Sequence, residues 1–127
     1  MDSFVLTNTT RKRTPRIPFE EIKNSIVGTH YAVSLVLVGA TRGKQVNTQW
    51  RGKTYVPNVL SFQTDAQAGE VYLTLAVAKR EAARYGHNFP EHVGYLFIHA
   101  LLHLKGLDHG ATMEKAEARA MKRFFPK

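Results

Sequence analysis

The sequence predicts a single α+β domain over residues 1–127, with a small mixed β-sheet of about four strands packed by about five helices. Two observations lead to this fold class. Short segments rich in apolar and β-branched residues alternate with longer segments whose apolar residues recur at helical intervals. A length of 127 residues suits one domain with one core, and no repeat, low-complexity tract or linker divides the chain.

Four segments predict strands. Residues 31–38, YAVSLVLV, form a short run of apolar and β-branched side chains, which is typical of a strand in the middle of a sheet. Residues 3–7 alternate weakly between apolar and polar side chains and predict a first strand. Two more strands are expected at residues 59–62 and 69–74.

Five segments predict helices, at residues 18–28, 41–50, 76–85, 90–106 and 111–125. The fourth has the strongest signal, because its apolar residues recur every three or four positions. Pro18 suits the first position of a helix, and Gly28 and Gly86 suit the ends of the helices that they close. The segment 41–50 is polar and allows only a short helix. The last helix is expected to turn inward a face made of Met113, Ala116, Ala120 and Phe124.

The composition narrows the possible functions. The chain carries 18 Lys and Arg against 10 Asp and Glu, a formal charge of +8 with neutral histidines. A positive surface attracts polyanions, so nucleic acid is the leading class of partner. The chain has no cysteine, which excludes disulfides, thiolate zinc sites and cysteine nucleophiles and leaves histidine as the soft metal ligand.

No segment predicts a membrane span or a secretory signal. The longest apolar run, residues 31–40, is far shorter than the ~20 residues that a membrane-spanning helix needs. The N-terminal residues have no basic flank followed by an apolar stretch. We therefore expect no contact with a membrane and a cytoplasmic protein.

The stretch HALLHLKGLDHG at residues 99–110 predicts a metal site on a helix and the turn after it. His99 and His103 are four residues apart, so their side chains share one helix face. Gly106 can take a left-handed conformation that ends the helix and returns His109 toward the pair. Three imidazoles on one Zn²⁺ per chain leave the fourth position for water, as in catalytic zinc sites. Asp108 is expected to accept a hydrogen bond from an imidazole or to brace the turn.

The spacing H-x-x-x-H-x-x-G-x-x-H is also that of metzincin proteases, which carry glutamate directly after the first histidine as general base. Ala100 stands at that position here. Without this carboxylate, peptide hydrolysis loses its main proton acceptor, so the metal geometry is expected to serve another reaction. A metalloprotease-like hydrolase and a non-enzymatic, zinc-stabilised module that binds RNA or the ribosome are the alternatives.

The same stretch resembles the YbeY family of bacterial metallo-endoribonucleases. The family pattern H-G-x-L-H-L-x-G-x-D-H is similar to HALLHLKGLDH, with Ala100 in place of the usual glycine. A second family pattern, L-N-x-x-Y-R-G-K-D-x-P-T-[DN]-V-L-S-F-P, is similar to VNTQWRGKTYVPNVLSFQ at residues 46–63, where Arg51 and residues 58–62 match. The resemblance runs from about residue 31 to the C-terminus, and the loop at residues 63–68 looks shorter than is usual in the family.

This resemblance implies a single metallo-endoribonuclease domain that uses zinc to cleave single-stranded RNA. It implies a role in 3′-end maturation of 16S ribosomal RNA and in ribosome quality control, with small-subunit rRNA, the ribosomal small subunit and its assembly factors as partners. The family's essential arginine falls on Arg51. We expect this guanidinium to bind the phosphate and the extra negative charge of its transition state.

Other basic and aromatic residues are candidates for RNA contacts. Lys53 and the run Arg11–Arg13 offer positive charge to the RNA backbone, although such runs usually mark a solvated surface. Trp50, Tyr55 and Phe62 offer rings for base stacking, although Phe62 is expected in the core. The histidines without a partner at a metal-binding spacing are expected at the surface or at helix caps, and they are His30, His87 and His92.

Overall fold

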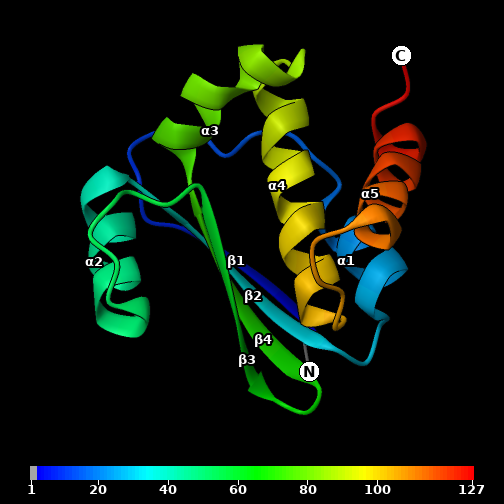
Figure 1. Cartoon of the computed structure of the whole chain (residues 1–127), viewed down its shortest axis with the longest axis horizontal. Coiled ribbons are helices and arrows are strands. Elements are labelled where there is room, and N and C mark those ends of the chain that lie inside the picture. The colour runs from blue at the N-terminus through cyan, green and yellow to red at the C-terminus, as the bar shows by residue number, and fades with distance from the viewer. Residues whose placement is uncertain (1–2) are drawn as a thin grey trace.

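The strands of the computed structural model, which describes residues 3–127, form one four-stranded sheet (Figure 1). They are β1 (Phe4–Asn8), β2 (Ala32–Val38), β3 (Val59–Asp65) and β4 (Ala68–Thr74). Their order across the sheet is β1-β2-β4-β3. β1 and β4 run parallel to β2, whereas β3 is antiparallel to β4. The mixed sheet confirms the predicted α+β fold class.

Helices cover both faces of this sheet. They are α1 (Phe19–Val27), α2 (Ala40–Arg51), α3 (Leu75–Glu81), the 3-10 helix η1 (Ala82–Tyr85), α4 (Phe89–Leu104) and α5 (Ala111–Phe124). α1, α4 and α5 lie on one side of the sheet, and α2 lies on the other (Figure 1). Within residues 3–127, no helix is long and apolar enough to cross a membrane.

The core lies between the sheet and the helices α1 and α4. Alternate residues of β2 and β4 point into it, and those of β2 are Val33, Leu35 and Leu37. α4 is buried on several sides because it also contacts α3 and α5. The helix that carries two of the candidate ligands is therefore held by packing along most of its length.

Some helices differ from their predicted bounds. Residues 41–50 are expected to form only a short helix, but α2 is 12 residues long because one of its faces is buried against β4. The helix expected over residues 76–85 starts one residue earlier and changes to a 3-10 helix at Ala82. α4 starts before Pro90 because Asn88 and Glu91 form a capping box, with N···O distances of 2.9 and 3.0 Å.

Candidate metal centre and the cleft around it

Three histidines meet at the C-terminal end of α4. His99 and His103 project from successive turns of that helix, and His109 lies in the segment between α4 and α5. One ring nitrogen from each histidine lies within 4.8 Å of the other two. The structure therefore brings together all three residues that the spacing singled out.

Gly106 turns the chain at the end of α4. Its φ is +104°, in the left-handed region that favours glycine. The N–H of Gly106 donates to the carbonyl of His103 at 2.9 Å, and the N–H of Leu107 donates to the carbonyl of Leu102 at 3.0 Å. This turn returns His109 to the helix face, as the sequence predicts.

Two hydrogen bonds orient the imidazoles of α4. Nδ1 of His99 lies 2.6 Å from Oε2 of Glu117 on α5, and Nδ1 of His103 lies 3.1 Å from the carbonyl oxygen of Leu107. Both partners are acceptors, so each Nδ1 atom donates to its partner and the Nε2 atoms are the ring nitrogens that face each other. The two Nε2 atoms lie 3.2 Å apart.

The nitrogen geometry fits a metal ion. The two Nε2 atoms are the ring nitrogens left to bind a cation, and they lie 3.2 Å apart. Tetrahedral zinc with Zn–N bonds of about 2.0–2.1 Å would hold its ligand nitrogens about 3.3 Å apart. Burial, and then the charges of His99 and His109, lower the pKa of His103, which favours the neutral imidazole that binds metals.

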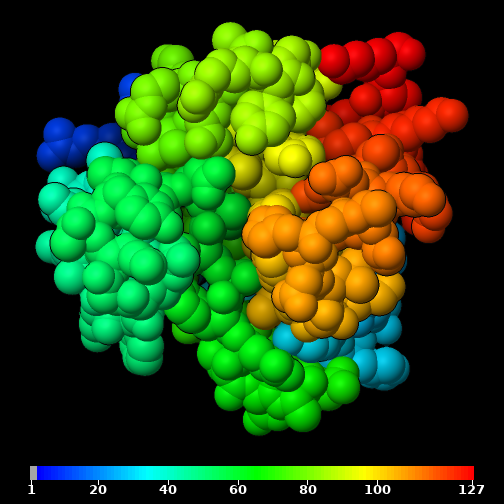
Figure 2. Space-filling model, in the orientation of Figure 1, coloured from blue at the N-terminus to red at the C-terminus, as the bar shows by residue number. Residues whose placement is uncertain are grey.

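These histidines line a cleft of about 660 Å³, a volume within the range of ligand sites. Figure 2 shows it as a hollow between α2 in teal, α3 and η1 in lime, and the orange segment between α4 and α5. Residues from several elements line its walls, and they include Arg51, Tyr55, Asn58, Ser61, Tyr85 and Tyr95.

Arg51 lies on the wall that faces α4. It is the last residue of α2, and its Nη1 atom donates to Oδ1 of Asn47 at 3.0 Å and to the hydroxyl of Tyr55 at 3.1 Å. The hydrogen bond from Arg51 also lowers the pKa of Tyr55. These bonds use one nitrogen and orient the guanidinium, so Nη2 and Nε are left to bind an anion.

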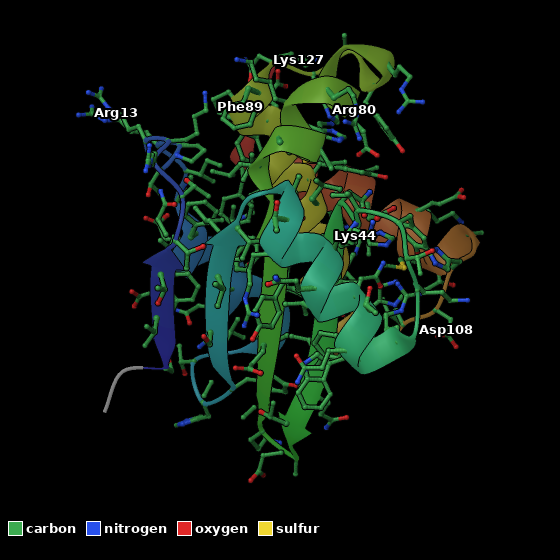
Figure 3. The ribbon with its side chains drawn as sticks, turned by 90° about the vertical axis from the view of Figure 1, so that its left-hand side faces the viewer. Arg13, Lys44, Arg80, Phe89, Asp108 and Lys127 are labelled. Carbon is green, nitrogen blue, oxygen red and sulfur yellow. The ribbon has the colours of Figure 1, made fainter. Side chains whose placement is uncertain are left out.

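Asp108 lies near the histidines but outside their contacts. Its side chain is exposed, and Figure 3 places it at the edge of the molecule. Among the described residues, the partners of the two α4 imidazoles are instead Glu117 and the carbonyl of Leu107. The charge of Asp108 raises the pKa of His103 and so offsets part of the decrease that burial causes.

The other candidates for RNA contacts are dispersed. Arg13 and Asp108 lie at opposite sides of the view in Figure 3, so the basic run Arg11–Arg13 is far from the histidines. Trp50 on α2 packs against Phe62 on β3, with ring centroids 6.2 Å apart, on the sheet face away from α4. Phe62 is only half-buried there, so its expected place in the core is wrong. Tyr55 lines the cleft, and Lys53 is exposed beside it in the chain.

The expectation of a surface or capping position is wrong for His92, whereas the backbone N–H of His87 donates to the carbonyl of Ala82 at 3.0 Å and caps η1. His92 is completely buried in α4, and His87 is half-buried just before that helix. Nε2 of His92 lies 3.2 Å from Oε1 of Glu81, and its Nδ1 lies 3.1 Å from Nδ1 of His87. A buried imidazole needs such partners, and α3 supplies the carboxylate. His30 is exposed, as predicted.

Sequence reasoning missed both Glu117 and His92, although each leaves a signal. Glu117 follows Met113 by one helical turn and is a carboxylate on the inward face of α5. His92 precedes Leu96 by four residues and His99 by seven, so it shares the stripe of α4 that faces the cleft. A titratable residue on an otherwise apolar stripe predicts a buried polar partner.

Sequence comparisons identify relatives over most of the chain. The model of the family described as Endoribonuclease YbeY matches residues 6–125. A protein of Aromatoleum aromaticum named Endoribonuclease YbeY is 39% identical over 88 residues, which are 67% of this chain and 57% of the relative. Its counterpart from Chromobacterium violaceum is 38% identical over 97 residues, which are 70% of this chain and 56% of the relative.

The chain thus spans little more than half the length of these two relatives. In structure, it is similar to a Thermotoga maritima protein solved in solution, with a TM-score of 0.70 at 22% identity. That similarity covers 94% of this chain and 87% of the other, and it supports the fold. From the family match over residues 6–125, the chain belongs to the YbeY endoribonuclease family.

Proposed function

We propose that this protein is a zinc-dependent endoribonuclease that cleaves single-stranded RNA. The observation that carries the proposal is the pair of Nε2 atoms, 3.2 Å apart on His99 and His103, in the same cleft as Arg51. A metal site and a guanidinium that face one cleft are suited to a phosphodiester.

The residues of the cleft have separable roles in this proposal. When bound by His99, His103 and His109, zinc supplies a Lewis acid and lowers the pKa of a bound water. Arg51 binds a non-bridging phosphate oxygen and the additional negative charge of the transition state. Its planar donors match phosphate better than an ammonium group does. Glu117 keeps the proton of His99 on Nδ1, which leaves Nε2 free to bind the ion.

The family name and the charge support RNA as the substrate. The net charge of +8 favours a polyanion, and the cleft is open at the surface, so a single strand can enter it. We propose the 3′ end of 16S rRNA as the natural target, with roles in rRNA maturation and ribosome quality control. The small subunit and its assembly factors are then the partners, in the cytoplasm.

Peptide hydrolysis has less support. In metzincins, the residue after the first histidine of the motif is the glutamate that acts as general base. Here it is Ala100, a buried residue with no group that can accept a proton. Among the residues that line the cleft, none is a carboxylate.

The first test is the cleavage of a labelled single-stranded RNA by the wild type and by His103→Ala, with bound zinc quantified in both. We expect the variant to lose both zinc and cleavage while circular dichroism shows a retained fold. His30→Ala is the matched control, because this exposed histidine lies outside the cleft, and it is expected to behave as wild type. Equal cleavage by wild type and His103→Ala contradicts a metal-dependent nuclease.

Removal of zinc separates the enzyme from a zinc-stabilised binding module. A chelator is expected to abolish cleavage and leave the circular dichroism spectrum unchanged, since the core lies between the sheet, α1 and α4. Unfolding on chelation at room temperature supports the binding module instead.

A further inference from the structure

Tyr85 is an aromatic residue of the 3-10 helix η1 whose side chain is exposed within the cleft. It is the last residue of η1, and 51% of its surface is accessible. The residue after it, Gly86, has a φ of +69° and turns the chain toward α4. Tyr85 lines the same cleft as the histidine cluster, from the wall formed by α3 and η1.

Three other rings pack behind Tyr85. Its ring centroid lies 4.7 Å from that of His92, 5.5 Å from that of Tyr95 and 5.9 Å from that of His87. Tyr95 and His92 are themselves stacked, at 5.7 Å with an interplanar angle of 19°. Burial is the main cause that raises the pKa of Tyr95 to about 12, so this ring stays neutral. Tyr85 is thus the exposed member of a packed aromatic group.

A chain of hydrogen bonds fixes this group beside the cleft. Oε1 of Glu81 accepts from Nδ2 of Asn58 at 3.3 Å and lies 3.2 Å from Nε2 of His92. The Nδ1 atoms of His92 and His87 lie 3.1 Å apart. Since His92 is completely buried, its ring has one orientation that satisfies both nitrogens. The aromatic group is therefore held rigidly against the wall.

A rigid ring with half its surface open to a cleft binds flat, apolar groups, and nucleobases are the flat groups of RNA. Tyr55 is the other exposed aromatic residue among those that line the cleft, but its hydroxyl is bound by Arg51. Hydroxyl and amide groups on β3, from Ser61 and Gln63, line the same cleft and offer donors and acceptors to a base edge.

We propose that Tyr85 forms a nucleobase subsite, on which a base next to the scissile phosphate stacks. This inference rests on the proposed endoribonuclease function. In this proposal, the wall formed by α3 and η1 recognises the base. The histidines and Arg51, on the other walls of the cleft, bind the phosphate. Because stacking strength increases with ring area, the subsite favours a purine over a pyrimidine.

The test measures RNA binding without cleavage. Fluorescence anisotropy gives the affinity of the zinc-bound protein for a short, unstructured, labelled RNA with 2′-O-methyl riboses and phosphorothioate linkages, which resist cleavage, and for the same RNA with one abasic nucleotide moved along it. In the wild type, we expect one abasic position to lower the affinity about 5- to 150-fold, the range of base stacking on an aromatic side chain. Tyr85→Ala should lower the affinity for the intact RNA by a similar factor, and Tyr85→Phe should not.

The combination of variant and abasic RNA is decisive. If the base stacks on Tyr85, the abasic nucleotide causes no further loss of RNA affinity in Tyr85→Ala. If the two changes act independently, their fold-losses in affinity multiply. Trp50→Ala is the control, because it removes an exposed ring on the other face of the sheet and should leave the abasic profile unchanged.

The outcomes distinguish this subsite from the proposed function. A wild type that cleaves RNA but shows the same affinities as Tyr85→Ala overturns the subsite alone. A wild type that neither binds nor cleaves the RNA overturns both proposals.

Discussion

Nδ1 of His99 lies 2.6 Å from Oε2 of Glu117, and this contact joins α4 to α5 at the candidate metal centre. Only 7% of Glu117 is exposed, so water does not compete for its carboxylate. A carboxylate that accepts from Nδ1 orients the ring and makes Nε2 a stronger donor to a metal. α5 thus acts on the centre without supplying a ligand.

Replacement of this carboxylate should weaken zinc binding. We expect Glu117→Gln to lower zinc affinity about 10- to 100-fold, because the amide is a weaker acceptor for the imidazole N–H. Competition with a chromophoric chelator measures the affinity. Glu114→Gln is the matched control, since Glu114 is exposed on the same helix. Equal affinities for the two variants would show that Glu117 does not tune the centre.

Arg51 should not tolerate lysine. We expect Arg51→Lys to lower kcat about 10²- to 10³-fold, the effect of removing one donor to the charge of a transition state. Lysine also cannot donate to Asn47 and Tyr55 with the geometry of a guanidinium. Initial rates on a labelled RNA test this, with Arg42→Lys as a control on the same helix. Zinc content should be unchanged, and a Lys variant with wild-type kcat refutes the role.

Stability should depend on pH through His87. Burial, and then the charge of His92, lower the pKa of His87 below 6.5 in the folded protein. Between the folded pKa and 6.5, the unfolded chain binds more protons, so the free energy of unfolding falls as the pH drops through this window. Urea unfolding at pH 7.5 and pH 5.5 measures the difference, which His87→Asn should reduce. An unchanged difference in His87→Asn argues against this origin.

Gly69 on β4 should be intolerant of a side chain. A Cβ atom there would lie 2.7 Å from Cδ2 of Leu104 at the end of α4 and 3.2 Å from the carbonyl oxygen of Phe62. We expect Gly69→Ala to destabilise the fold by about 1–3 kcal/mol, as overpacking does. In the Leu104→Ala background, Gly69→Ala should lower the free energy of unfolding by less. A double-mutant cycle of urea unfolding measures this coupling. Additive effects would contradict this contact.

The sequence predicted those parts of the molecule that depend on local chain geometry. The convergence of His99, His103 and His109 follows from helical spacing and one glycine, so it could be predicted without knowing the fold. The positions of the strands follow from runs of apolar residues. The order β1-β2-β4-β3 depends on which segments pair across the sheet, and no local pattern specifies that.

Contacts between distant segments could not be predicted. Glu117 meets His99 from 18 residues away, and His92 meets Glu81 from 11 residues away, because α4 packs against α5 and α3. Arg51 looks like a solvated turn residue in the sequence. Its place in the cleft depends on how α2 lies over β3 and β4, so only the family resemblance indicated its role.

The histidine cluster and its supporting carboxylate come from one continuous stretch of chain, between His99 and Glu117. Arg51 reaches the same cleft only because α2 packs on the sheet, in which β2 pairs with β4 between residues that are 36 positions apart, such as Ala32 and Ala68. The two halves of the site therefore differ in their sensitivity to partial unfolding. As denaturant loosens α2 from the sheet, the catalytic rate should fall first, while the histidines on α4 and the segment after it still retain the ion.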